Sequence, residues 1–163
     1  MILPIYTYGH PVLKKVGVDI DQDYEALDTL LSNMYETMYG AKGVGLAAPQ
    51  IGLAIRLFIV DTIQIMEDDK KETGIKKAFI NAQILEESGD LWAYEEGCLS
   101  IPNVRGDVER PPKIRIRYMD EQFNQYEEEY EGINGRVIQH EYDHIEGILF
   151  TEKLKPLKKK LVQ

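Results

Sequence analysis

The stretch His140-Glu141-Tyr142-Asp143-His144 matches the pattern HExxH, and it constrains the fold more than any other part of the chain. At about 100° per residue on a helix, His144 lies ~40° around from His140, with Glu141 beside them. The three side chains then face one cavity. Two imidazoles can bind a metal ion that lowers the pKa of a bound water, and Glu141 can take the proton of that water. The pattern predicts metal-assisted hydrolysis.

The residues around the motif favour a largely buried helix. Asn134 is suited to cap its start, and apolar residues recur at spacings of three and four. These residues are Ile133, Val137, Ile138, Ile145, Ile148 and Leu149. Buried imidazole and carboxylate groups need partners, and a metal ion satisfies all of them at once. The alternative is two histidines that coincide by chance and have ordinary hydrogen-bond partners.

A catalytic site of this type usually has three protein ligands. The metzincin extension would place the third ligand at position 150, which is Phe150 rather than histidine. A glutamate on a second downstream helix would need more chain than follows His144. Of the nearer carboxylates, Glu146 points away from the histidine face and Glu152 follows the helix end. We therefore expect the third ligand upstream.

Cys98 is the only cysteine in 163 residues, and it lies in a turn-like stretch after a strand predicted at Leu91–Tyr94. Three roles are open to it. It can be a small buried apolar residue, a nucleophile paired with a histidine, or a thiolate ligand. As a ligand it would complete a Cys-His-His set, which suits iron or zinc and leaves one position for water.

The segment Gly43–Gln50 is rich in glycine and alanine, and its first residues read G-x-G-x-x-A. A dinucleotide fingerprint should follow a strand and open a helix, whereas this segment follows a helix and leads through Pro49 into a strand. We therefore expect no nucleotide cofactor. The glycines would let a peptide backbone approach closely, and the amide of Gln50 could donate to an oxyanion. A glycine-rich turn without a catalytic role is the alternative.

Three segments together resemble the peptide deformylase family. The family's motifs GxGLAAxQ, EGCLS and HExDH appear in order and without a gap as Gly43–Gln50, Glu96–Ser100 and His140–His144. The resemblance extends over nearly the whole chain, from Tyr8–Leu13 to the lysine-rich end. It implies a hydrolase that removes the formyl group from N-formyl-methionyl peptides emerging from ribosomes and releases formate.

The resemblance also implies roles for individual residues. Cys98, His140 and His144 would bind the metal, and Glu141 would be the general acid and base. The Gln50 amide and the Leu99 backbone N–H would stabilise the oxyanion. The expected substrate-binding residues are Gly45, Gly97, Arg105 and, around an apolar methionine pocket, Val44, Tyr94, Ile133 and Val137. The implied metal is ferrous iron, and the ligand set also accepts zinc, nickel or cobalt.

The remaining pattern predicts an α+β fold with mostly antiparallel sheets packed around the central HExxH helix. An amphipathic helix, capped by Asp23, is expected to run to about Tyr39. The strands are expected at Leu57–Val60, Ala78–Leu85, Leu91–Tyr94, Ile114–Met119 and Gln125–Tyr130. We expect one catalytic domain over residues 1–163, because no linker divides the chain.

The composition of the chain excludes some classes of binding partner. A net charge of −9 argues against nonspecific binding to nucleic acid. No apolar run is long enough to span a membrane and no signal sequence is apparent, so we expect a cytoplasmic protein. The lysine-rich tail, about residues 153–163, departs from this acidic character. A solvated terminus is the expected interpretation, and because the substrates of the resembled family emerge from ribosomes, a weak electrostatic contact with ribosomal RNA is the alternative.

Two other functional classes stay open. The first is another metal-dependent amidase or peptidase, which would cut internal peptide bonds. The second is a non-catalytic module in which the metal only stabilises the fold, and such closed sites have four protein ligands. A fourth ligand is hard to find, because the remaining histidine, His10, is remote in sequence.

Overall fold

The computed structural model describes residues 1–153, and the lysine-rich tail from residue 154 onward lies outside the described residues. The helices of the described part are α1 (Leu27–Gly40) and α2 (Gly132–Ile145). Its strands are β1 (Gly45–Ala47), β2 (Leu57–Asp61), β3 (Lys76–Ser88), β4 (Trp92–Cys98), β5 (Ile101–Arg110), β6 (Lys113–Met119) and β7 (Gln125–Glu131). Short 3₁₀ helices are η1 (Pro11–Lys14), η2 (Ala48–Ile51), η3 (Ile63–Ile65), η4 (Asp68–Thr73) and η5 (Phe150–Lys153).

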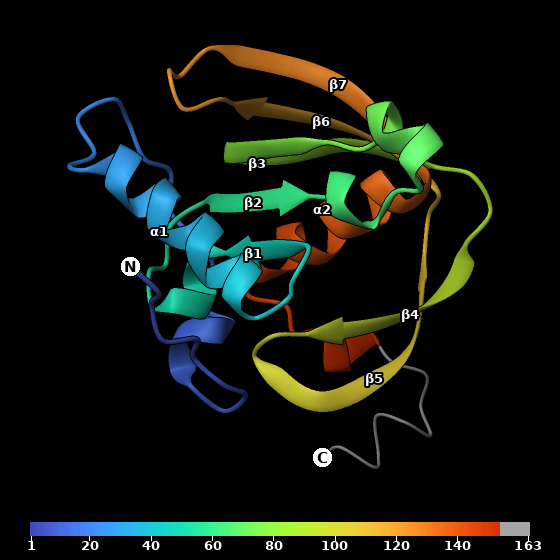
Figure 1. Cartoon of the computed structure of the whole chain (residues 1–163), viewed down its shortest axis with the longest axis horizontal. Helices are drawn as coiled ribbons and strands as arrows, with labels where there is room; N and C mark the ends of the chain where they lie inside the picture. The colour runs from blue at the N-terminus through green and yellow to red at the C-terminus, as the bar shows by residue number, and fades with distance from the viewer. Residues whose placement is uncertain (154–163) are drawn as a thin grey trace.

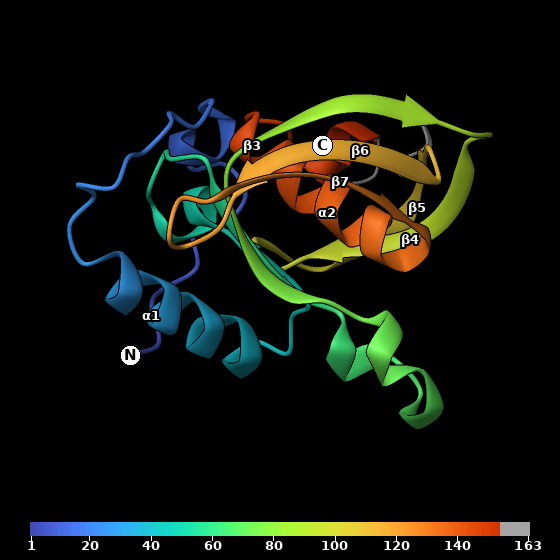
Figure 2. The ribbon, with the colours of Figure 1, turned by 90° about the horizontal axis from the view of Figure 1, so that it is seen from above.

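Five strands form one antiparallel sheet in the order β1-β2-β3-β6-β7, and β4 pairs with β5 in a separate hairpin. The long strand β3 joins the two halves of the sheet: its first residues pair with β2 and its last with β6. The register shifts between Ile80 and Gln83, where Asn81 has a left-handed φ of 55°. Figure 2 shows β3 curving along the sheet.

Strand β2 is buried on both faces, and its alternation divides the core. Leu57 and Ile59 pack in the cluster that includes Met34 and Met38 of α1. Phe58 and Val60 pack in a second cluster, which includes Val137, Ile138 and Ile145 of α2. The sheet therefore has α1 on one face and α2 on the other.

Helix α2 lies between the five-stranded sheet and the β4–β5 hairpin (Figure 1). A smaller apolar cluster joins Ile101 and Val108 of the hairpin to Phe150 of η5. This arrangement confirms the α+β fold with antiparallel sheets around the helix that carries the histidines. No helix within residues 1–153 is long and apolar enough to cross a membrane.

Two predicted helix caps are wrong. Helix α1 begins at Leu27 rather than next to Asp23, because Ala26 adopts a left-handed φ of 57° and Asp23 lies in a turn in which its N–H donates to Asp21. Helix α2 begins at Gly132, so Asn134 lies inside its first turn. The Asn134 amide donates instead to the Thr73 carbonyl oxygen at 2.8 Å, and this contact ties the helix to η4.

The five predicted strands are all present, but the hairpin differs from the prediction. The strand expected at Leu91–Tyr94 continues to Cys98, and the tight turn is confined to Leu99 and Ser100. Strands β1 and β5 were not predicted. Both contain residues that argue against a strand, because β1 reads Gly-Leu-Ala and β5 begins Ile-Pro.

Candidate metal centre

The HExxH residues lie on α2 and face the interior. His140, Glu141 and His144 have exposed fractions of 9%, 4% and 2%. Nearly the whole helix from Gly135 onward is buried, because the sheet covers one side and the hairpin the other. The polar groups of the motif are therefore removed from solvent, and each needs a partner in the interior.

Cys98 joins the two histidines from the end of β4. Its Sγ lies 3.3 Å from Nε2 of His144, and the ligand atoms of Cys98, His140 and His144 all lie within 4.8 Å of one another. Burial alone would raise the pKa of the Cys98 thiol, but the two imidazoles hold that pKa well below its usual value. A thiolate is the form of cysteine that binds metals.

The donor set fits one divalent metal ion. One thiolate and two imidazoles are soft and borderline ligands that suit iron or zinc, and three protein ligands leave a position open. Oε1 of Glu141 is buried and has no hydrogen-bond partner among residues 1–153, so the carboxylate keeps an unused acceptor beside the ligand cluster. Burial also raises the pKa of Glu141. Within the described residues the cluster has three ligands, which is one fewer than a closed structural site requires.

Glu96 fixes the orientation of His140, a role that sequence reasoning missed. Its Oε1 lies 2.9 Å from Nδ1 of His140. Because a carboxylate only accepts hydrogen bonds, Nδ1 carries the proton and Nε2 has its lone pair free for a metal. Glu96 also accepts two hydrogen bonds from Arg110, at 2.8 and 3.0 Å, and one from Arg136.

The missed residues had a signal in the sequence. Arg136 precedes His140 by four positions on a helix that reads as buried, and a buried guanidinium requires a carboxylate partner. Glu96 stands beside Cys98 in the EGCLS segment. The contact between them depends on the hairpin, and the sequence does not reveal how the hairpin docks.

Hydrogen bonds fix the orientation of the Gln50 side-chain amide. Its Oε1 accepts a hydrogen bond from the Ala47 N–H at 2.9 Å, so Nε2 must point the opposite way. Nε2 lies 3.2 Å from Oγ of Ser100 and 3.6 Å from Sγ of Cys98. An amide donor is thus fixed beside the cysteine ligand.

The structure gives a further reason for glycine at position 45, beyond the close approach of a peptide backbone. A Cβ at this position would lie 2.5 Å from Oε2 of Glu141, so the glycine makes room for the carboxylate. Gly45 also lies in β1, the edge strand of the sheet. The backbone N–H of Asp61, the last residue of β2, donates to the carbonyl oxygen of Val44 just before β1. Alternation then directs the backbone N–H and carbonyl of Gly45 away from β2, toward the cavity.

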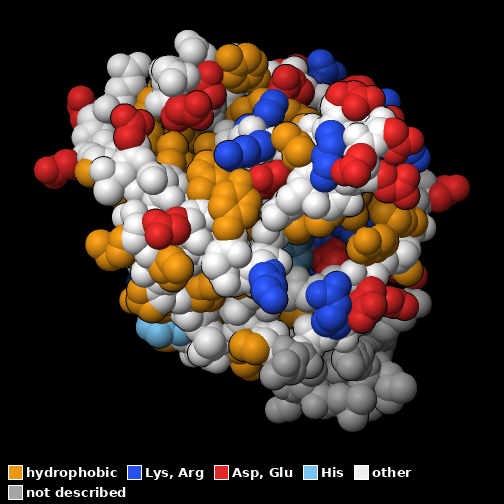
Figure 3. All heavy atoms as spheres, in the orientation of Figure 1, with side chains coloured by type: hydrophobic (Ala, Val, Ile, Leu, Met, Phe, Trp, Pro, Cys, Tyr) orange, Lys and Arg blue, Asp and Glu red, His pale blue; other side chains and the backbone are white. Residues whose placement is uncertain are grey.

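The cavity beside the ligands has a volume of about 730 Å³, which is ample for a peptide end. Figure 3 shows it opening on one face, with histidine and acidic side chains at its floor. Twelve of the thirteen residues that the sequence singled out line it: Val44, Gly45, Gln50, Tyr94, Gly97, Cys98, Leu99, Arg105, Ile133, Val137, His140 and Glu141. The thirteenth, His144, is buried behind Cys98 in the ligand cluster.

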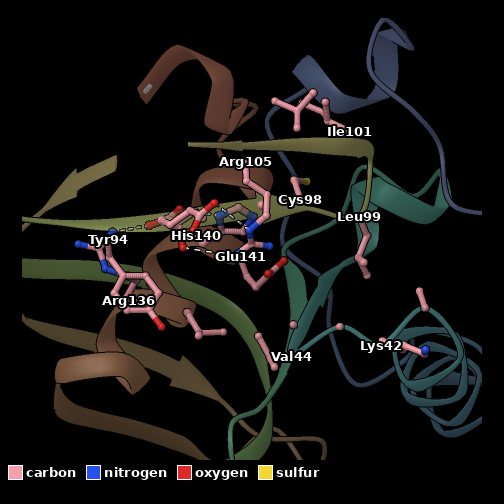
Figure 4. A pocket seen from close by; sticks show the side chains of 18 of the residues that line it. Lys42, Val44, Tyr94, Cys98, Leu99, Ile101, Arg105, Arg136, His140 and Glu141 are labelled. Carbon is pink, nitrogen blue, oxygen red and sulfur yellow. Dashed lines mark hydrogen bonds and ion pairs between the residues drawn. The ribbon is translucent and has the colours of Figure 1, made fainter. Parts of the chain in front are cut away.

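Figure 4 shows how these residues converge from different elements. Cys98 and His140 lie near the centre, and the Glu141 carboxylate approaches β1 at Gly45. Arg105 is exposed at the rim, where its Nε lies 3.5 Å from the Glu95 carboxylate. The remaining histidine, His10, caps η1 by accepting from the Val12 N–H and is not part of the ligand cluster.

A buried HExxH helix, a thiolate from a neighbouring hairpin and a cavity beside them define a mononuclear metal-dependent hydrolase. The polypeptide deformylase family model matches residues 2–160. The chain belongs to the polypeptide deformylase family. The activity that follows is hydrolytic removal of the N-formyl group from nascent peptides.

Individual relatives agree with this assignment. A peptide deformylase of Flavobacterium psychrophilum is 57% identical, with all of this chain and 88% of that protein covered. The crystal structure of the Thermus thermophilus peptide deformylase is 40% identical with a TM-score of 0.86, covering 99% of this chain and 91% of that one. A Met-Ala-Ser-bound class I type b peptide deformylase of Acinetobacter baumannii is 32% identical with a TM-score of 0.84, covering 94% and 99%.

Proposed function

We propose that the chain deformylates N-formyl-methionyl peptides at the centre formed by Cys98, His140 and His144. The observation that carries the proposal is the convergence of these three donors beside the buried carboxylate of Glu141. The bound divalent ion would supply Lewis acidity, which makes water a stronger acid and polarises the formyl carbonyl.

Glu141 is the proton carrier in this proposal. It takes a proton from the attacking water, and it returns that proton to the nitrogen of methionine as the bond between the formyl carbon and nitrogen breaks. The products are formate and a peptide with a free amino terminus. The raised pKa of Glu141 suits both halves of the transfer, because a general acid and base works best when its pKa lies closer to the working pH.

Two donors face the oxygen on which negative charge develops. Nε2 of Gln50 is held in place because Oε1 is engaged by Ala47. The backbone N–H of Leu99 is the second proposed donor, and it lies in the tight turn directly after Cys98. Donors fixed before the reaction stabilise the developing charge without reorganisation.

The peptide would bind as an added strand along the open edge of β1. Gly45 offers its backbone N–H and carbonyl on that edge, and Gly97 and Arg105 lie across the cavity. The methionine side chain would pack in the part of the cavity that is lined by Val44, Tyr94, Ile133 and Val137. The Met-Ala-Ser peptide bound to the Acinetobacter relative supports a substrate of this kind.

We propose ferrous iron as the native metal, with zinc, nickel and cobalt as other ions that the ligands accept. Iron bound to a thiolate makes the enzyme sensitive to oxygen. Metal analysis of protein purified without oxygen tests this point. Iron in equimolar amount and activity that decays in air are expected, and stoichiometric zinc with air-stable activity would contradict it.

The proposal places one catalytic domain over residues 1–163 in the cytoplasm, where nascent peptides are made. It retains a weak ribosome contact through the lysine-rich tail, with a solvated terminus as the alternative. Sedimentation with ribosomes at increasing salt tests the contact. Affinity that falls with salt and with deletion of Lys158–Lys160 is expected, and affinity indifferent to both would exclude it.

Product analysis separates deformylation from the other metal-dependent activities. Formyl-Met-Ala-Ser and acetyl-Met-Ala-Ser are incubated with the metal-loaded protein and their products are identified by mass spectrometry. We expect formate and Met-Ala-Ser from the first peptide and slow or no reaction of the second. Cleavage of internal peptide bonds would indicate a peptidase, and no reaction with metal fully bound would indicate a non-catalytic module.

A further inference from the structure

The three metal ligands come from two elements that pack in different parts of the molecule. The histidines lie on α2, whose apolar side chains belong to the cluster on the sheet. Cys98 lies on the β4–β5 hairpin, and its apolar neighbours belong to the separate cluster of Ile101, Val108 and Phe150. The position of Cys98 relative to the histidines therefore depends on what joins the hairpin to α2.

Arg136 makes one such connection, and it bonds the backbone of the hairpin directly. It lies on α2 one turn before His140, and only 2% of its surface is exposed. Its Nη2 donates to the Trp92 carbonyl oxygen of β4 at 2.6 Å, and its Nη1 donates to the Val108 carbonyl oxygen of β5 at 3.0 Å. One guanidinium thus bonds the backbones of both hairpin strands.

The hairpin also encloses the guanidinium with aromatic rings. Cζ of Arg136 lies 4.3 Å from the centre of the Trp92 ring and 5.5 Å from that of Tyr94. Figure 4 shows Arg136 beside Tyr94 at one end of the cavity. A planar, delocalised cation can stack and donate through its fork at the same time, whereas a lysine ammonium cannot reproduce both.

Glu96 carries this connection to the metal ligand. Arg136 Nη1 donates to Oε2 of Glu96, while Oε1 of the same carboxylate is bonded to His140. Arg110 completes the group by binding both Glu96 and Asp143. Two cations and two anions balance, and buried pairs of this kind tolerate little displacement because an unpaired buried charge is costly.

We propose that Arg136 is a positioning residue that holds the Cys98 hairpin against the histidine helix, so that the three metal ligands are in place before the metal binds. The proposal rests on the proposed function only for the identity of the metal ligands. It requires no statement about the substrate.

The test compares Arg136→Met and Arg136→Lys with a matched control, Arg56→Met. Arg56 is also buried, with an exposed fraction of 5%. Its Nη1 lies 3.2 Å from the carboxylate of Glu146, the residue that follows α2. None of its described contacts is with Glu96 or the hairpin. Cobalt(II) is titrated into each metal-free protein in competition with a chelator. The thiolate-to-cobalt absorption reports whether Cys98 is bound, and hydrogen exchange reports the opening of β4 and β5.

We expect Arg136→Met to weaken cobalt binding by roughly 10- to 100-fold, the usual effect of losing a residue that orients metal ligands. The thiolate-to-cobalt absorption should fall, and the β4 and β5 amides should exchange faster relative to those of β2 and β3. Arg136→Lys should lie between the wild type and Arg136→Met. Arg56→Met should lower global stability without a selective effect on the hairpin or on cobalt affinity.

Wild-type cobalt affinity and hairpin exchange in Arg136→Met would overturn the proposal. An equal loss of affinity in Arg56→Met, with exchange faster throughout the sheet, would also overturn it, because the effect would then be global. If Arg136→Met does not fold, wild-type behaviour of Arg136→Lys is the contradicting result. Failure of the wild type to bind cobalt would refute the metal ligands themselves, while bound cobalt without deformylation would refute the proposed function alone.

Discussion

Oε1 of Glu96 lies 2.9 Å from Nδ1 of His140, and this contact links a metal ligand to a group of buried charges. The carboxylate has an exposed fraction of 6% and accepts hydrogen bonds from both Arg110 and Arg136. The orientation of the histidine is therefore set by a group of charges between α2 and the hairpin. The stability of the fold and the binding of the metal should therefore both depend on Glu96.

Replacement of Glu96 by glutamine should destabilise the fold strongly. Two buried guanidiniums would lose their shared anion, and breaking a buried pair costs about 3–5 kcal/mol. Urea unfolding of the metal-free protein measures the change. Glu109→Gln on β5 is the control, because that side chain is exposed and should change stability by less than about 0.5 kcal/mol. Equal stability of the two variants would contradict the buried network.

The pH dependence of stability should show the same carboxylate. Burial alone would raise the pKa of Glu96, but the hydrogen bonds from His140 and Arg110 lower it from 4.5 to about 2. A lowered folded-state pKa stabilises the protein above pH 4.5, and this contribution, about 3 kcal/mol, is lost as the pH falls from 4.5 toward 2. Metal-free protein is used so that metal release does not contribute. A free energy of unfolding that stays level across this range would contradict the shift.

A methyl group at Gly45 should impair catalysis without preventing folding. The Cβ of Gly45→Ala would lie 2.5 Å from Oε2 of Glu141 and displace the proton carrier. A misplacement of a catalytic group by about 1 Å costs about 100-fold in kcat. Gly40→Ala is the control, since its Cβ would meet only the flexible end of Ile2 at 3.2 Å. Activity of Gly45→Ala equal to that of Gly40→Ala would show that Glu141 is not confined by β1.

Glu141→Gln should retain the metal and lose turnover. The amide preserves shape but cannot carry the proton, and general acid–base catalysis contributes roughly 10²–10⁴-fold. Metal content and formate release are measured on the same sample. Turnover within a factor of about two of the wild type would remove Glu141 from its assigned role.

Cys98→Ala should lose the metal. Removal of the thiolate leaves two imidazoles, which are too few ligands for a catalytic centre of this type. Elemental analysis after gel filtration measures metal retention, with Ser100→Ala as a control that alters the neighbouring buried hydroxyl but no ligand. Stoichiometric metal in Cys98→Ala would show that the third ligand lies elsewhere.

The sequence predicted most of the site because the motif residues are local. His140, Glu141 and His144 lie on one helix, and their common face follows from helical geometry alone. Cys98 and Gln50 were candidates from the residues alone, with other roles still open, and the resemblance to a family fixed their assignment. In the structure they meet because η2, which carries Gln50, lies against the end of β4, where Cys98 and Ser100 contact its amide.

The parts that were missed depend on tertiary packing. The start of α1 is set by the left-handed Ala26, a conformation that an alanine does not signal in advance. Asn134 has a residue type suited to a cap, yet its amide is used by the Thr73 carbonyl. Arg136 and Glu96 are distant in sequence, and only the docking of the hairpin on α2 brings them together.

Formate release from formyl-Met-Ala-Ser by protein purified without oxygen, with and without a chelator, is the decisive measurement of metal-dependent deformylation. We expect turnover that disappears on chelation and returns when ferrous or nickel ions are added, with no loss of the fold. Turnover indifferent to chelation would contradict it and would make Cys98 a nucleophile. Absence of turnover with metal fully bound would contradict the proposed reaction while leaving the metal centre in place.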